Sequence, residues 1–143
     1  MPFTPPHLLG KQWSHLRIGI FGGTFNPPHS GHLHVCDVAL KTGKFDFIWW
    51  MVTPGNPLKR HQTASSFEQR LLWSQNIVTH PRMLVTDIEQ QLNTRKSIDT
   101  IRALKRHFPL THFTFIAGTD NALSLHKWEE WRTLLQEIGR AHV

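Results

Sequence analysis

Two histidines stand three residues apart in one segment, Gly22 to His32, which reads Gly-Gly-Thr-Phe-Asn-Pro-Pro-His-Ser-Gly-His. If His29 and His32 both lie at the start of a helix, about one turn separates them and they share a face. Imidazoles donate hydrogen bonds to phosphate oxygens near neutral pH, and free N–H groups at a helix N-terminus attract anions. Gly22 and Gly23 remove Cβ atoms where phosphates would approach the backbone. The segment therefore predicts phosphoryl chemistry, which depends more on positioning and charge stabilisation than on covalent help.

Each of these features also has a simpler interpretation. A glycine pair after a strand is common, and the segment is neither a G-x-G-x-x-G fingerprint nor a P-loop. His29, His32 and His34 are alternative metal ligands, although no nearby cysteine or acidic pair completes a ligand set. His34 taken alone is typical of an exposed position.

Predicted strands and helices alternate along the chain. Short apolar runs rich in β-branched and aromatic residues predict strands at 17–21, 45–52, 83–88 and 112–117. Apolar spacing and stop signals predict helices at 31–41, 67–79, 97–108 and 128–135. This order predicts an α/β fold, a Rossmann-like parallel sheet with helices on both faces. Such sheets bind ligands at the carboxyl ends of their strands, so the loops after Phe21, Val52 and Ala117 are expected to share one rim.

Composition narrows the class of protein. The 143 residues suit one domain, which we place at 17–136 after a leader at 1–16. A formal net charge of +6 favours a phosphate-rich partner, but the basic residues are scattered, so no nucleic-acid partner is expected. No run of eighteen apolar residues exists, so no membrane partner is expected either. Cys36 is the single cysteine, which fits a reducing, cytoplasmic setting.

Taken whole, the string GIFGGTFNPPHSGH is far more specific than its parts. It resembles the signature of the nucleotidyltransferase superfamily with the H/T-x-G-H motif, and its GGTFNPPH form is most similar to nicotinate-nucleotide adenylyltransferases. Asn26 stands where most members carry Asp. The resemblance continues through residues 53–59, 67–70 and 115–121, followed by Trp128 and Trp131. Residues 94–100 depart from the Ser-Tyr-Thr-x-x-Thr pattern of the family, with Lys96 for Tyr and Ser97 for Thr.

The resemblance implies that AMP is transferred from ATP to nicotinate mononucleotide, with release of pyrophosphate and with Mg²⁺ assisting but no metal site of the protein's own. It implies that His32 and His29 are the catalytic residues, in contact with the ATP phosphates. The residues expected to bind the substrates are Gly22, Gly23, Thr24, Phe25, Asn26, Gly31, Lys59, Ser97, Gly118, Asp120 and Trp128. Among them, Ser97 and Trp128 are expected at the nicotinate end. Alternatively, Trp128 packs in the core, Lys59 lies in a solvated loop and Asp120 caps a helix.

Two other functions stay open. One is an enzyme of the same superfamily with another acceptor, such as pantetheine phosphate, although those relatives usually show Thr in the first motif position and lack the Gly-x-Asp…Trp stretch. The other is a nucleotide-binding or nucleic-acid-binding module without catalysis, favoured by the basic charge and by the truncation that the resemblance implies. The oligomeric state does not follow from the sequence.

The resemblance also implies that the last part of the family's domain is missing from this sequence. Family members continue with a further strand and an Ile-Ser-x-Thr-x-Ile-Arg type segment that supplies more phosphate contacts, so we expect the domain to be incomplete and the chain to have weak or no activity. Residues 137–143 (EIGRAHV) can be back-translated as GAGATCGGAAGAGCACACGTC, which contains the start of a widely used sequencing-library adapter. We interpret this stretch as translated adapter, and a genomic sequence that runs through EIGRAHV uninterrupted would contradict that interpretation.

Overall fold

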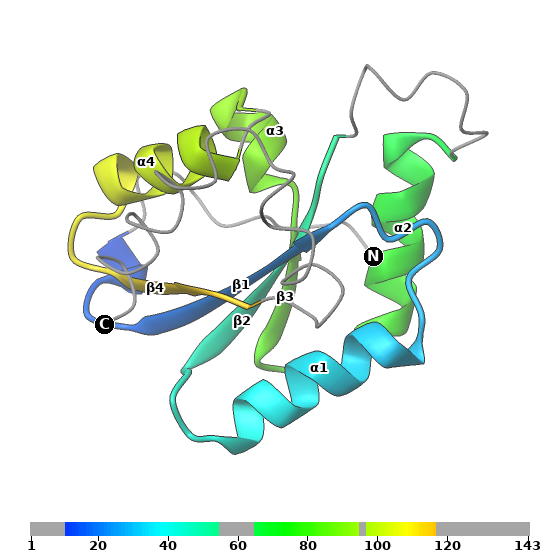
Figure 1. The fold of residues 1–143 in the computed structure, drawn as a ribbon, viewed down its shortest axis with the longest axis horizontal. Helices are drawn as coiled ribbons and strands as arrows, with labels where there is room; N and C mark the ends of the chain where they lie inside the picture. The colour runs from blue at the N-terminus through cyan, green and yellow to red at the C-terminus, as the bar shows by residue number, and fades with distance from the viewer. Residues whose placement is uncertain (1–10, 55–64, 95–96, 117–143) are drawn as a thin grey trace.

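The computed structural model describes residues 11–54, 65–94 and 97–116, which form one parallel sheet with helices on both faces (Figure 1). The strands are β1 (Arg17–Gly23), β2 (Phe47–Val52), β3 (Met83–Thr86) and β4 (His112–Phe115). Their order in the sheet is β3-β2-β1-β4, and every neighbouring pair is parallel. This confirms the predicted α/β fold.

The helices divide between the two faces of this sheet. They are a short 3-10 helix (Lys11–Trp13), α1 (Ser30–Lys41), α2 (Phe67–Ile77), α3 (Ile88–Leu92) and α4 (Ser97–His107). Figure 1 shows α1 and α2 on one face and α3 and α4 on the other. The chain runs outward from β1 to β3 on the first face, then returns across the second face to place β4 beside β1. A parallel sheet opens a ligand crevice at such a reversal of strand order.

Side chains that alternate along the strands pack into two hydrophobic clusters, one on each face of the sheet. Trp49 and Trp50 are neighbours in β2, and both are fully buried, but they belong to different clusters. Trp50 packs in the cluster that includes Leu40 of α1, whereas Trp49 packs in the cluster that includes Leu104 of α4. Side chains of successive strand residues point to opposite faces, so β2 supplies one indole to each core.

The third strand is shorter than the sequence predicted. The strand expected at 83–88 ends at Thr86, and the helix α3, which was not predicted, begins at Ile88. The Ile88 N–H donates to Thr86 Oγ1 at 3.1 Å, and Asp87 stands at the N-cap position. Ile88 is fully buried, so its apolar character fits a strand and a buried helix start equally well.

The remaining element boundaries differ from the predictions by at most two residues. The leader up to residue 10 and the predicted helix at 128–135 lie outside the described residues. Among the helices that the structure describes, none has both the length and the hydropathy to cross a bilayer.

An exposed ion pair marks the amino end of the sheet. The Arg17 guanidinium lies 3.2 Å from Asp46 Oδ1 and also donates to the Gly43 carbonyl at 3.0 Å. Hydrogen bonds from Arg17 lower the pKa of Asp46. Exposed pairs of this kind stabilise little, so Arg17 serves mainly to order the turn that precedes β2.

Candidate active site

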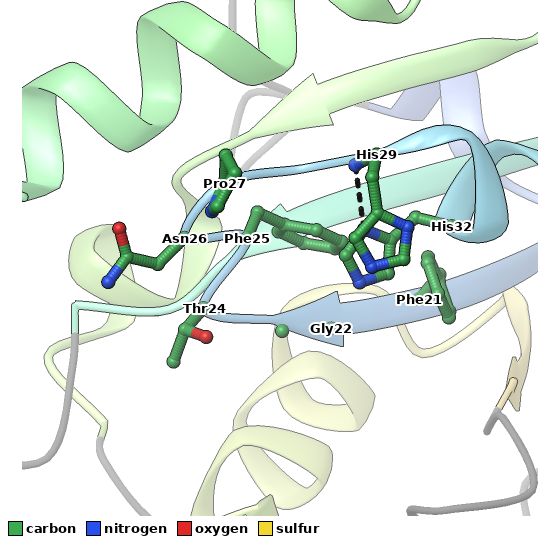
Figure 2. A pocket seen from close by; sticks show the side chains of 9 residues that line it. Phe21, Gly22, Thr24, Phe25, Asn26, Pro27, His29 and His32 are labelled. Carbon is green, nitrogen blue, oxygen red and sulfur yellow. Dashed lines mark hydrogen bonds between the residues drawn. The ribbon is translucent and has the colours of Figure 1, made fainter. Parts of the chain in front are cut away.

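A pocket of about 360 Å³ opens at the carboxyl end of β1 (Figure 2). Its lining, among the residues that the structure describes, comes from the end of β1, the loop that follows and the first turn of α1. The lining residues are Phe21, Gly22, Gly23, Thr24, Phe25, Asn26, Pro27, His29 and His32. The structure therefore brings together most of the site residues predicted between Gly22 and His32.

The two imidazoles lie against each other. The ring centroids of His29 and His32 are 3.7 Å apart, with 22° between the ring planes. The His29 N–H donates to Nδ1 of His32 at 3.1 Å, and the Gly31 N–H donates to Nδ1 of His29 at 3.1 Å. Both Nδ1 atoms act as acceptors, so in each neutral ring the proton resides on Nε2. The pair then offers two Nε2–H donors side by side.

Burial keeps His32 uncharged near neutral pH. It lowers the pKa of His32 below its usual value of 6.5, and the neighbouring His29 lowers the pKa further. A neutral imidazole in this tautomer donates one hydrogen bond and avoids repulsion within the stacked pair. Protonation would place a proton on Nδ1 of His32 and break the hydrogen bond that this atom accepts from the His29 N–H, so an anion would meet a neutral imidazole that donates from Nε2. The pair is therefore suited to an anionic ligand.

The backbone N–H groups at the start of α1 differ from the prediction. The sequence predicted free N–H groups there, facing the anion site. Instead, the N–H groups of His29 and Gly31 donate to imidazoles, and that of His32 donates to the His29 carbonyl at 3.0 Å. The histidines cap the helix reciprocally, as Ser and Glu do in the usual capping box. In this structure the imidazole edges, rather than these backbone groups, are left to meet a phosphate.

Phe25 anchors the loop between β1 and α1. Its ring stacks on Trp50 with centroids 4.4 Å apart, and the edge of His32 meets it at 5.0 Å. Only 2% of Phe25 is exposed, and its φ of 51° is unusual for a bulky residue. Predicted as a substrate contact, Phe25 lines the pocket mainly from the core side and supports the imidazole pair.

The predicted glycines satisfy packing needs within the chain. A Cβ on Gly22 would lie 2.8 Å from Met51 Cε, and one on Gly23 would lie 3.3 Å from the Phe25 ring. At Gly31 a Cβ would lie 2.9 Å from Cε1 of His29. The sequence interpretation of Gly22 and Gly23 was room for phosphates. The structure gives a further reason, which is that Met51 and the Phe25 ring occupy the space a side chain would need.

Thr24 and Asn26 are exposed at the mouth of this pocket. Figure 2 shows both side chains pointing away from the imidazole pair. His34 is also exposed, two residues along α1 from His32, and no group of three or more potential metal ligands occurs in the described part of the chain.

Several predicted site residues cannot be placed against the pocket. Lys59, Gly118, Asp120 and Trp128 lie outside the described residues. Ser97 is the first residue of α4, but its side chain is not described.

Two buried polar residues were given no role by the sequence reasoning. Arg70 of α2 is 4% exposed and bonds to loop carbonyls beside the pocket. Glu89 of α3 is 5% exposed and accepts a hydrogen bond from the Thr100 hydroxyl of α4 at 2.9 Å. The helical spacing of apolar residues does not predict that either side chain is buried. Their burial and their hydrogen bonds become evident only from the tertiary structure.

The fold and the pocket together define a class, that of doubly wound α/β proteins with a pocket after the first strand of a parallel sheet. The chain belongs to the cytidylyltransferase-like family, whose sequence model matches residues 20–143. It is 47% identical over 121 residues to a protein of Ruegeria pomeroyi named a probable nicotinate-nucleotide adenylyltransferase, covering 85% of this chain and 56% of the relative. A Brucella suis protein of the same name is 40% identical over 128 residues, covering 90% and 66%.

Solved structures agree on the fold. The nicotinic acid mononucleotide adenylyltransferase of Plasmodium falciparum in complex with NaAD superimposes with a TM-score of 0.71 at 21% identity, covering 84% of this chain and 60% of that one. The same enzyme in complex with APC gives 0.70 at 21% identity, covering 84% and 59%. The chain thus spans about 56–66% of the length of these curated relatives and 59–60% of these solved chains.

Proposed function

We propose that the protein transfers AMP from ATP to nicotinate mononucleotide, giving nicotinate adenine dinucleotide and pyrophosphate. The observation that carries this proposal is the stacked imidazole pair on the pocket after β1. The names of the curated relatives support the choice of acceptor. The Plasmodium complexes with NaAD and APC, which share the fold, also support a nucleotide ligand.

The chemistry asks little of the protein beyond binding and charge stabilisation. A phosphate oxygen of the mononucleotide attacks the α-phosphorus of ATP, the bond from that phosphorus to the bridging oxygen breaks, and pyrophosphate leaves with the electron pair. The attacking phosphate is largely a dianion at pH 7, so no general base is required. His32 and His29 donate from Nε2 to phosphate oxygens on which charge builds up. Donors fixed in advance in this way cost no reorganisation at the moment of reaction.

The divalent cation that accompanies ATP is proposed to be Mg²⁺. No carboxylate is among the described residues that line the pocket, and the described segments contain no cluster of three potential ligands. The triphosphate oxygens would hold the ion, which would neutralise charge on the leaving pyrophosphate.

The substrate contacts beyond the described pocket are also proposals. Lys59 is assigned to a phosphate, Gly118 and Asp120 to ATP, and Ser97 and Trp128 to the nicotinate end. These assignments rest on the resemblance of the surrounding motifs. We also propose a cytoplasmic location, where ATP is available and the free thiol of Cys36 stays reduced.

Binding measurements separate this function from its two alternatives. Calorimetric titrations would use ATP, nicotinate mononucleotide, phosphopantetheine and a single-stranded oligonucleotide in turn, on the protein expressed from its complete gene. We expect ATP and nicotinate mononucleotide to bind. Binding of phosphopantetheine in place of nicotinate mononucleotide would favour another acceptor, and binding of the oligonucleotide alone would favour a nucleic-acid-binding module.

A further inference from the structure

Arg70 of α2 is a buried cation that holds several loops together. Its Nη1 donates to the carbonyl of Thr24 at 2.9 Å and to that of Thr53 at 2.8 Å. Its Nη2 donates to the Pro54 carbonyl at 3.1 Å, and its Nε donates to the Ser65 carbonyl at 3.3 Å. Four carbonyls from three separate segments therefore converge on one guanidinium.

The hydrogen-bond partners of this guanidinium are all neutral carbonyls, and the carboxylate of Glu68 acts on its charge through space. Four carbonyl dipoles and the ring of Phe67, whose centroid lies 5.6 Å from Cζ, surround the charge. Burial lowers the pKa of Arg70, but arginine keeps its charge in proteins. A buried cation needs compensation, and here oriented carbonyl groups supply it. A planar fork with five N–H donors can satisfy several carbonyls at fixed angles, whereas an ammonium cannot match that geometry.

The positions of the acceptors relate Arg70 to the pocket. Thr24 lines the pocket and directly follows β1, and Thr53 directly follows β2. The Thr53 N–H also donates to the Gly23 carbonyl at 2.9 Å. Arg70 itself is not among the lining residues. Its contacts fix the carboxyl ends of two central strands relative to each other, at the point where the loop to His29 begins.

The loop from Thr24 to His29 then has two anchors. The Arg70 guanidinium holds the Thr24 carbonyl, and the stacking of Phe25 on Trp50 holds the next side chain. A short loop that is fixed at its start and capped at its end leaves little freedom for the imidazoles.

On these contacts, and resting on the function proposed above, we propose that Arg70 is a positioning residue of the nucleotide site. It fixes the loop between β1 and α1 so that His29 and His32 meet the phosphates in one geometry. Arg70 does not touch the reacting atoms. Its effect on the rate comes through the Thr24 carbonyl.

The test uses Arg70→Lys, which keeps the charge but loses the planar fork. Arg17→Lys is the matched control, because Arg17 also bonds to a backbone carbonyl but lies at the amino end of the sheet. Displacements of about 1 Å at a reacting group cost up to about 100-fold in rate. We therefore expect kcat/KM for ATP to fall about 10- to 100-fold in Arg70→Lys, mostly in kcat, and to stay near the parental value in Arg17→Lys.

Amide hydrogen exchange provides a readout that needs no activity. The His29 N–H bonds to His32 Nδ1, so its exchange rate reports the imidazole pair directly. We expect Arg70→Lys to speed exchange at Thr24, Phe25 and His29 roughly tenfold, while β2 stays protected. If the parent releases no pyrophosphate with nicotinate mononucleotide, the proposed function fails, yet the exchange data still test the role of Arg70.

Three results would overturn the proposal. The first is parental kcat/KM in Arg70→Lys, and the second is a lowered melting temperature of that variant with unchanged exchange at His29.

If Arg70→Lys does not fold, Arg70→Gln takes its place, because glutamine keeps an amide donor without the charge. The third contrary result is loss of folding in both variants, since it would make Arg70 a general stabilising residue.

Discussion

At the scale of single residues, the stacked pair His29 and His32 carries the chemistry that we propose for the pocket. Each imidazole does two things at once, because its Nδ1 caps the helix and its Nε2 is left to donate. The capping role and the proposed catalytic role therefore fall on the same two side chains. Any substitution at His32 must separate the two before its effect on the rate can be interpreted.

We predict that His32→Gln slows the reaction without unfolding the helix start. A glutamine at this position can bond back to the N-cap N–H through its amide oxygen, as in an ordinary capping box, but its flexible amide N–H2 replaces the donor that the stacked imidazole holds in place. Loss of one preorganised donor costs about 10²- to 10³-fold in rate. Steady-state kinetics should show kcat reduced by about that factor, with a much smaller change in KM.

Stability measurements on the same samples complete this test. His32→Ala should lower kcat similarly but also lower the melting temperature, because it loses the cap. His34→Ala, at the exposed position on the same helix, should leave both unchanged. A His32→Gln protein that turns over at the parental rate would assign His32 to capping alone.

At the scale of elements, the start of α1 depends on the absence of a side chain at Gly31. A Cβ there would lie 2.9 Å from Cε1 and 3.0 Å from Nδ1 of His29. That ring is stacked on His32, so displacing one imidazole disturbs the other. The helix itself would accept alanine, which is favoured over glycine by up to about 1 kcal/mol in helices.

Gly31→Ala is therefore predicted to reduce activity more than stability. We expect kcat/KM to fall by up to about 100-fold through misplacement of His29, while the melting temperature changes little. Ser30→Ala is the control, since Ser30 is the exposed neighbour. Parental activity in Gly31→Ala would show that the imidazoles tolerate the shift.

The second helical layer is joined by a buried polar contact. The Thr100 hydroxyl of α4 donates to Glu89 Oε2 of α3 at 2.9 Å. The hydroxyl oxygens of Thr94 and Thr100 lie 2.7 Å apart. Burial raises the pKa of Glu89 from 4.5 to about 7. This contact sets how α4 begins, and Ser97, a predicted substrate contact, is its first residue.

The raised pKa of Glu89 predicts a pH-dependent stability. The folded state favours the neutral form of the Glu89 carboxyl. The contribution of this group to the free energy of unfolding is therefore complete below pH 4.5 and is lost as pH rises through about 7. Glu89→Gln keeps an acceptor for Thr100 but cannot ionise. At pH 8 it should raise the free energy of unfolding by up to about 3 kcal/mol, and the gain should vanish near pH 4.5.

Urea denaturation across this pH range checks the prediction. Asp99→Asn changes an exposed acid on α4 and should leave the pH profile intact. A Glu89→Gln protein with the parental pH profile would contradict the account of a buried neutral acid.

At the scale of the whole molecule, periodicity predicted the sheet and most helices because core positions repeat with the period of each element. It missed α3 because Ile88 is apolar in a strand and in a buried helix start alike. Within the site, the motif identified the imidazoles and the glycines. It could not predict that Met51 fills the space beside Gly22 or that Arg70 bonds to the Thr24 carbonyl, because these residues are distant in the sequence.

The function that we propose for this pocket is the joining of AMP to nicotinate mononucleotide. The most direct test is pyrophosphate release by the protein expressed from its complete gene, with ATP, Mg²⁺ and one acceptor at a time. We expect release with nicotinate mononucleotide, formation of nicotinate adenine dinucleotide in equal amount, and a rate about 10²- to 10³-fold lower in His32→Gln. Robust release with phosphopantetheine and none with nicotinate mononucleotide would contradict the assignment.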